Sequence, residues 1–166
     1  MQPKRPTIIQ SILVAVAILA FVVVLSLLLG LVSLPVWPFI FFMFFLTTLS
    51  QVNRTGWVDT FVGGLIGLIV GMAQVIGTQF FGATVGLALL AVAVLVILTL
   101  VVDGRFKYTN KACLFVLTAV SSFAAFIPFE QVMPVILSFL LGAAFFGIIV
   151  LVAESRSKKK TLAGAA

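Results

Sequence analysis

The fourteen charged residues of this chain are confined to a few short clusters, and long charge-free stretches separate them. The charge-free stretches cover residues 6–53, 60–102, 112–129 and 131–153. A helix that crosses the hydrocarbon core of a bilayer needs about 20 mainly apolar residues. The first two stretches are long enough for two such helices each, and the last two for one each. The pattern therefore predicts an all-α integral membrane protein with six transmembrane helices.

Turn-forming residues divide the two longest stretches. Residues 33–38 contain two prolines, which cannot continue a helix from upstream, and residues 77–82 begin and end with glycine. The expected spans are residues 9–32, 36–52, 58–78, 82–102, 110–127 and 132–153. The chain then consists of a six-helix transmembrane domain over residues 1–155 and a basic cytoplasmic tail over residues 156–166.

The basic residues predict the orientation of these spans, because Lys and Arg favour cytoplasmic loops. With six spans and a cytoplasmic N-terminus, all ten basic residues fall on the cytoplasmic side, and Glu130 is the single charge outside. Omitting the fifth span would place the basic tail outside. We therefore expect both termini in the cytoplasm.

Composition narrows the possible functions. Apolar residues make up 63% of the chain and charged residues 8%, against roughly half and a quarter in a soluble domain. The chain has no histidine and one cysteine, Cys113, so we expect no enzyme, no cofactor and no metal site. The net charge of +6 is explained by orientation and by attraction to anionic lipid. Basic residues dispersed among short loops do not predict a nucleic-acid partner.

Small residues recur at helical spacing in several spans, where they allow helix backbones to approach closely. In the third span, Gly63, Gly67 and Gly71 lie at four-residue intervals. The residues assigned to helix packing or to a backbone-lined pathway are Gly63, Gly67, Gly71, Gly82, Gly86, Gly142 and Gly147. Spacing alone does not separate an internal packing seam from a homo-oligomer contact or a narrow passage.

Few polar side chains fall at membrane depth, and four of them form the candidate solute pathway. Gln74 lies in the outer half of the third span, and its amide is costly to bury without a partner. Thr118, Ser121 and Ser122 share one face of the fifth span, where hydroxyls can bond back to their own helix. No ionisable residue is expected at mid-depth, which argues against a buried proton relay or a charged filter.

The acidic residues have structural explanations. Asp59 is expected in the first turn of the third span, where the helix dipole favours a carboxylate. Asp103 and Glu154 lie among basic residues and are expected to be ordinary charge partners.

A weak internal repeat is also visible. A shift of 78 residues aligns Phe61 with Phe139 and Gly64 with Gly142, so that spans one to three would match spans four to six. A repeat of three helices places its two copies in opposite orientations, as in many transporters. The sequence thus raises the possibility of two inverted three-helix repeats.

Three segments carry a resemblance to a known family: residues 33–37 (SLPVW), 63–72 (GGLIGLIVGM) and 138–147 (SFLLGAAFFG). Over roughly residues 12–153 the chain resembles the bacterial multi-pass inner-membrane proteins of the domain-of-unknown-function 1097 family. A weaker likeness, through residues 60–71, is to the membrane part of fusaric-acid-resistance-type exporters. The resemblance implies a protein of the bacterial cytoplasmic (inner) membrane, and it supplies neither a substrate nor a catalytic residue.

Two function classes follow from these features. Six spans, glycine-lined faces and uncharged polar groups favour a small transporter or channel for a neutral or weakly polar solute. The alternative is a non-transporting accessory or assembly subunit of a membrane complex, since distinctive polar chemistry and soluble domains are scarce. The expected partners are the lipid bilayer, a small solute, and a second copy or another membrane protein.

Overall fold

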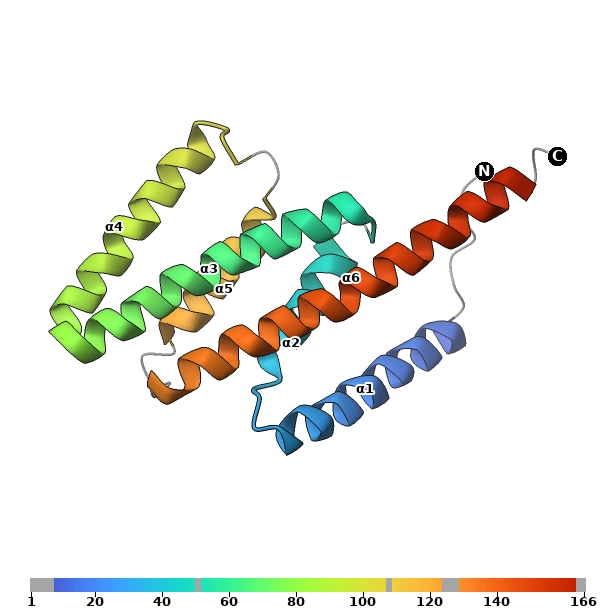
Figure 1. Ribbon diagram of the computed structural model, residues 1–166, viewed down its shortest axis with the longest axis horizontal. Helices are drawn as coiled ribbons and strands as arrows, with labels where there is room; N and C mark the ends of the chain where they lie inside the picture. The colour runs from blue at the N-terminus through green and yellow to red at the C-terminus, as the bar shows by residue number, and fades with distance from the viewer. Residues whose placement is uncertain (1–7, 50–51, 107–108, 124–128, 164–166) are drawn as a thin grey trace.

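The computed structural model describes residues 8–49, 52–106, 109–123 and 129–163, and this part of the chain is helical, without β-strands (Figure 1). Its elements, in chain order, are α1 (Ile8–Leu31), α2 (Trp37–Phe44), the π-helix η1 (Phe45–Leu49), α3 (Arg54–Phe81), α4 (Ala83–Val102), α5 (Lys111–Phe123), the 3₁₀-helix η3 (Phe129–Gln131) and α6 (Val132–Ala163). Each expected span overlaps one α-helix, but in the second span α2 ends at Phe44 and the chain continues as η1 to Leu49, and α6 continues for ten residues beyond the expected end of its span. The expected end of the fifth span, residues 124–127, lies outside the described residues.

Three helical segments of the described residues are long and apolar enough to cross a membrane: Arg54–Phe81, Ala83–Val102 and Phe129–Ser155. They indicate a membrane-embedded protein. The other apolar segments are shorter; α5, for example, has 13 residues, or about 20 Å of rise, against a hydrocarbon core of about 30 Å. The number of crossings therefore rests on the charge pattern as well as on helix length.

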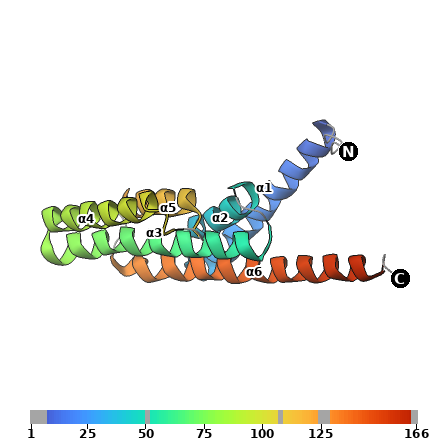
Figure 2. The ribbon, with the colours of Figure 1, turned by 90° about the horizontal axis from the view of Figure 1, so that it is seen from above.

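The long helices α3 and α6 run side by side in opposite directions at the centre of the molecule (Figure 1). The short helix α5 packs on α3, and the short helix α2 packs on α6. Figure 2 shows α2 and α5 on the same side of the α3–α6 pair, while the N-terminal end of α1 projects away from the bundle. In Figure 1, α4 flanks the pair on the α3 side and α1 flanks it on the α6 side.

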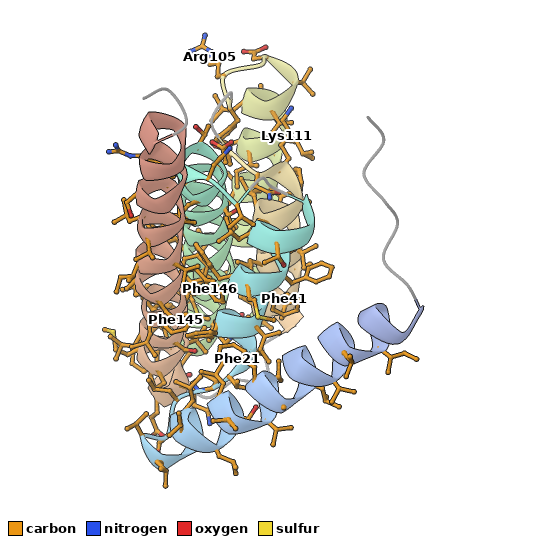
Figure 3. All side chains as sticks on the ribbon, turned by 90° about the vertical axis from the view of Figure 1, so that its right-hand side faces the viewer. Phe21, Phe41, Arg105, Lys111, Phe145 and Phe146 are labelled. Atoms are coloured by element: carbon orange, nitrogen blue, oxygen red, sulfur yellow. The ribbon has the colours of Figure 1, made fainter. Side chains whose placement is uncertain are left out.

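The core lies between α2, α3 and α6 and is built from aromatic rings. Phe139 and Phe42 are fully buried, and their ring centroids are 5.4 Å apart in an edge-on contact. Trp57 and Phe61 stack in parallel at 5.3 Å, and Phe61 stacks in turn on Phe139 at 6.1 Å. Close packing of this kind stabilises helix association in lipid, where burial of apolar surface gives little driving force. Figure 3 shows Phe21 of α1 near Phe145 of α6, where the two rings stack at 6.1 Å.

The turn expected at residues 77–82 is wrong, because α3 continues through Phe81 and only Gly82 separates it from α4. Gly82 has a φ of 91°, a conformation that side chains rarely permit. Gly77 stays helical and lies against Gly86 of α4, where a Cβ atom on Gly77 would be 3.2 Å from the Gly86 Cα. At the break the Gly82 N–H donates to the Thr78 carbonyl (3.0 Å) and the Gly82 carbonyl accepts from the Gly86 N–H (3.1 Å), so Gly82 itself is hydrogen-bonded to both helices.

The start of α3 also differs from expectation. The side chain of Asn53 accepts a hydrogen bond from the Gly56 N–H (2.8 Å) and caps the helix, which therefore begins at Arg54. Asp59 consequently lies beyond the first turn, and the helix-dipole explanation given for it is wrong. The predicted start of this helix was its first apolar residues, and the capping residue lies upstream of them.

The charged segments meet at one end of the bundle. The Arg54 N–H donates to Glu154 Oε1 (2.9 Å), and the Asn110 N–H donates to the carbonyl of Asp59 (2.9 Å). Asp103 and Arg105 form an exposed ion pair at 3.7 Å, which confirms the expected role of Asp103. Figure 3 shows Arg105 and Lys111 at this same end. Segments far apart in the sequence thus bring charged residues together at one end of the bundle.

Candidate functional site

The glycine row of α3 is a close-packed seam against α5. A Cβ atom built on Gly63 would lie 2.5 Å from the carbonyl oxygen of Asn110, and one on Gly67 would lie 2.4 Å from that of Leu114. Real Cβ atoms do not approach backbone oxygens this closely, so only glycine permits the two helices to lie at this distance. This row is therefore a packing seam and not a passage.

Ser121 belongs to the same seam. It is fully buried against Gly71, where a Cβ atom would collide with the Ser121 side chain. Its hydroxyl donates to the carbonyl of Leu117 and lies 3.5 Å from that of Gly67. Of the four residues assigned to the solute pathway, Ser121 is thus the one that lies in the α3–α5 seam and lines no described cavity.

Of the other predicted glycines, three lie in close contacts between helices and one forms a turn. A second seam joins α3 to α4, since a Cβ atom on Gly86 would lie 2.7 Å from the backbone nitrogen of Thr78 and 2.9 Å from the carbonyl oxygen of Gln74. On α6, Gly142 packs against the backbone of Phe39 and Gly147 against the ring of Trp57. Gly82 has no atom within 4 Å of its Cβ position and serves the α3–α4 turn instead.

Gln74, Thr118 and Ser122 line one cavity of about 480 Å³ between α3, α4 and α5. This volume is in the range of small-molecule sites. The remaining lining side chains are apolar: Leu87, Leu90, Val94, Phe115 and Ala119. The structure therefore brings together three of the four polar residues that the sequence singled out, although Gln74 on α3 is more than 40 residues from Thr118 and Ser122 on α5.

The two glycine seams explain why this cavity exists. Gly71 holds α3 against α5, Gly77 holds α3 against α4, and Gln74 lies midway between them along α3. Both partners approach α3 closely, whereas α4 and α5 do not pack extensively against each other. The space between α4 and α5 remains open, and Gln74 forms part of its floor.

The polar groups of the cavity differ in how they are hydrogen-bonded. The Thr118 hydroxyl donates to the carbonyl of Leu114 (2.8 Å), and the Ser122 hydroxyl donates to that of Thr118 (2.6 Å). Gln74 Oε1 is buried and accepts no hydrogen bond within the described part of the chain. A buried amide oxygen without a partner is costly, and this oxygen can accept a hydrogen bond from a ligand or water.

A second cavity, of about 440 Å³, lies between α3 and α6 near the charged end, and the sequence did not predict it. Arg54, Trp57 and Gly147 are among its lining residues. The ring of Trp57 packs on α6 at Gly147, and its indole N–H donates to the Ala143 carbonyl (2.8 Å). The feature of the sequence that could have indicated this cavity is the set of small residues on α6, against which the Trp57 ring packs.

The described residues bring no three His, Cys, Asp or Glu side chains close enough together to hold a metal ion. Cys113 is buried in the α3–α5 seam, with its Sγ 3.6 Å from the carbonyl of Thr60. The thiol therefore packs as a small apolar group.

Comparison with known protein families, with curated proteins and with solved structures finds no match to this chain. The resemblance to the domain-of-unknown-function 1097 family stays a prediction from the quoted segments.

Proposed function

We propose that the chain is a small multi-pass membrane transporter or channel for a neutral or weakly polar solute. The observation that carries this proposal is the cavity of about 480 Å³, in which Gln74, Thr118 and Ser122 converge among apolar side chains. A mostly apolar cavity with a few convergent polar groups is typical of small-molecule sites. The unpartnered oxygen of Gln74 supports the same interpretation.

An inverted repeat is part of the proposal, because such repeats build many transporters. Each half has the same order of elements: a flanking helix (α1 or α4), a short helix (α2 or α5) and a long central helix (α3 or α6). Under the proposed repeat α1, α2 and α3 correspond to α4, α5 and α6, and in Figure 1 the central pair α3 and α6 lies between the flanking helices α1 and α4.

Contacts in one half recur in the other at the 78-residue shift. The Cβ position of Gly64 lies 3.0 Å from Leu117, and that of Gly142 lies 3.1 Å from Phe39; each pair maps onto the other under the shift. Phe61 and Phe139, which are equivalent under the shift, stack directly on each other. A residue close to a two-fold axis contacts its own equivalent, so this stacking supports the repeat.

A second pair of equivalent contacts lies one helical turn away. Cys113 Sγ approaches the Thr60 carbonyl at 3.6 Å, and the Ser138 hydroxyl donates to the Pro35 carbonyl at 2.5 Å. Thr60 is equivalent to Ser138, and Pro35 is equivalent to Cys113. The two halves therefore share contact positions as well as element order.

The proposed topology has six crossings and both termini in the cytoplasm of a bacterial cell, and the short helix α5 is its critical element. The charge-free residues 112–129, which include most of α5, separate the basic residues proposed to lie inside from Glu130, proposed to lie outside. Cys113 is the sole cysteine, so Cys113→Ala gives a background in which Arg105→Cys and Glu130→Cys can each be labelled alone.

We expect a membrane-impermeant maleimide to label Glu130→Cys in intact bacterial cells and Arg105→Cys only after permeabilisation. Both native side chains are exposed, so accessibility reports the side of the membrane. Labelling of both positions from the same side would show that α5 does not cross, and the six-span topology would be wrong.

The transport proposal is tested by solute flux into proteoliposomes. Gln74→Leu is expected to lower protein-dependent flux of a small neutral solute at least about tenfold, because it removes the polar floor of the cavity at nearly constant volume. Gln79→Leu is the matched control, since Gln79 lies on the same helix, is exposed and is not a lining residue. Absence of protein-dependent flux across a panel of amides, alcohols and polyols would overturn the proposal.

The accessory-subunit alternative draws on one observation. Most of the described side chains of α1 are exposed, including Leu19, Leu27 and Leu31, and the helix has few contacts with the rest of the bundle. Such a helix can face lipid or another membrane protein. A stoichiometric partner that co-purifies in mild detergent and is lost when α1 carries Leu27→Ser would favour this alternative.

A further inference from the structure

We infer that the cavity between α3, α4 and α5 selects neutral solutes whose polar end donates hydrogen bonds, such as primary amides and alcohols. This inference rests on the proposed transport function and names the class of solute. The direction of the hydrogen bonds that the cavity side chains already make determines which class of solute can bind.

The two hydroxyls of the cavity have already used their protons. The Thr118 proton is donated to the Leu114 carbonyl at 2.8 Å, and the Ser122 proton to the Thr118 carbonyl at 2.6 Å. A hydroxyl has one proton and two lone pairs, so each oxygen retains only the ability to accept. To a solute, both groups are therefore acceptors.

Gln74 adds a third acceptor. Its Oε1 is buried and accepts no hydrogen bond from the described residues, so a solute N–H or O–H can satisfy it. The amide nitrogen of Gln74 also carries N–H groups, which a solute with both a donor and a carbonyl can use. A solute without donors would leave at least the Gln74 oxygen unpaired, at the cost of a buried polar group without a partner.

The solute is neutral because the cavity offers no charge. None of the residues that line it is ionisable, so an ammonium group would lose its hydration without gaining a counter-ion. An anion would meet the oxygen lone pairs of the cavity, with only the Gln74 amide N–H groups as donors and no cation to neutralise its charge. The apolar wall formed by Leu87, Leu90 and Val94 suits a short hydrocarbon body.

One such site per chain is expected. Under the 78-residue shift, Gln74, Thr118 and Ser122 correspond to Val152, Ile40 and Phe44. The equivalent positions of the other half are therefore apolar and offer no acceptor. A site confined to one half of a repeat binds a single solute at a time.

The test uses two isomers that differ in hydrogen-bond donors. Butanamide and N,N-dimethylacetamide have the same formula, and only butanamide has N–H groups. Flux is measured by stopped-flow light scattering in proteoliposomes of the full chain, after subtraction of the flux in protein-free liposomes. We expect protein-dependent flux of butanamide to exceed that of N,N-dimethylacetamide by about fivefold to tenfold, the factor that one unmade hydrogen bond gives.

Ser122→Ala and Thr118→Val are expected to reduce this ratio by removing acceptors. Thr99→Val is the matched control, because the Thr99 hydroxyl makes the same type of bond to its own helix (Leu95 carbonyl, 2.9 Å) but lies exposed on α4, outside the cavity. Equal protein-dependent flux of the two isomers would overturn the inference and leave the transport function standing. Absence of protein-dependent flux for both isomers and for the wider solute panel would overturn both.

Discussion

Replacing Gly67 by leucine is expected to prevent α3 and α5 from packing and to abolish recovery of monodisperse protein after detergent extraction. A Cβ atom at this position would already be 2.4 Å from the Leu114 carbonyl oxygen and 3.1 Å from the Leu117 Cβ. The nearest atom is backbone, so a rotamer change cannot relieve the contact, and the helices must separate. Size-exclusion chromatography of the extracted variant measures the effect.

The smaller change Gly67→Ala makes the same prediction measurable as a free energy. Crowding a tightly packed site costs about 1–3 kcal/mol, and the better helix propensity of alanine returns up to about 1 kcal/mol, so we expect a net loss of about 1–2 kcal/mol. Gly30 on α1 is the control for both substitutions, because its Cβ position has no atom within 4 Å. If Gly67→Ala proved as stable as Gly30→Ala, the close packing of α3 against α5 at Gly67 would be contradicted.

Replacing Phe139 by alanine is expected to destabilise the centre of the bundle by about 3 kcal/mol. The Phe139 ring is fully buried and contacts Phe42, Phe61 and the backbone of Gly64. Removing a buried phenylalanine from a soluble core costs about 3–5 kcal/mol. We expect the lower end of this range, because lipid rather than water receives the ring when the helices separate.

Thermal denaturation in detergent, followed by tryptophan fluorescence, measures this loss, since Trp57 stacks on Phe61 beside the substituted ring. Phe81→Ala is the control, because Phe81 is 71% exposed at the end of α3. If the Phe139→Ala variant had the same melting temperature as Phe81→Ala, the Phe139 ring would not be what holds the two central helices together. The stacking of Phe61 on Phe139 would then no longer support the proposed inverted repeat.

The positions of the helices could be predicted from the sequence, because they depend on local chemistry. Charge-free stretches and turn residues predicted one helix near each of the six α-helices, but the second expected span, residues 36–52, is α-helical only over Trp37–Phe44 and continues as the π-helix η1, and α6 extends further than expected. The errors arose at ends that long-range or side-chain contacts determine. Gly77 looked like part of a loop, but its contact with Gly86 makes it part of a helix seam, and Asn53 extended α3 through a side-chain cap.

The candidate site could be predicted only in part. Gln74, Thr118 and Ser122 were recognised as polar residues at membrane depth, and they do line one cavity. Ser121 follows the same spacing rule, yet it points into the α3–α5 seam. Helical periodicity locates a residue on its own helix but contains no information about which neighbouring helix covers that face.

By itself, the sequence determined that the chain is helical and apolar enough for lipid, and that its charges gather at helix ends. These properties follow from residue type and spacing, because water and lipid act on each segment separately. Only the tertiary structure decided that the glycine row is a packing seam and that an open cavity lies beside Gln74. The physical reason is that both depend on how closely α4 and α5 approach α3, which backbone contact between distant segments determines.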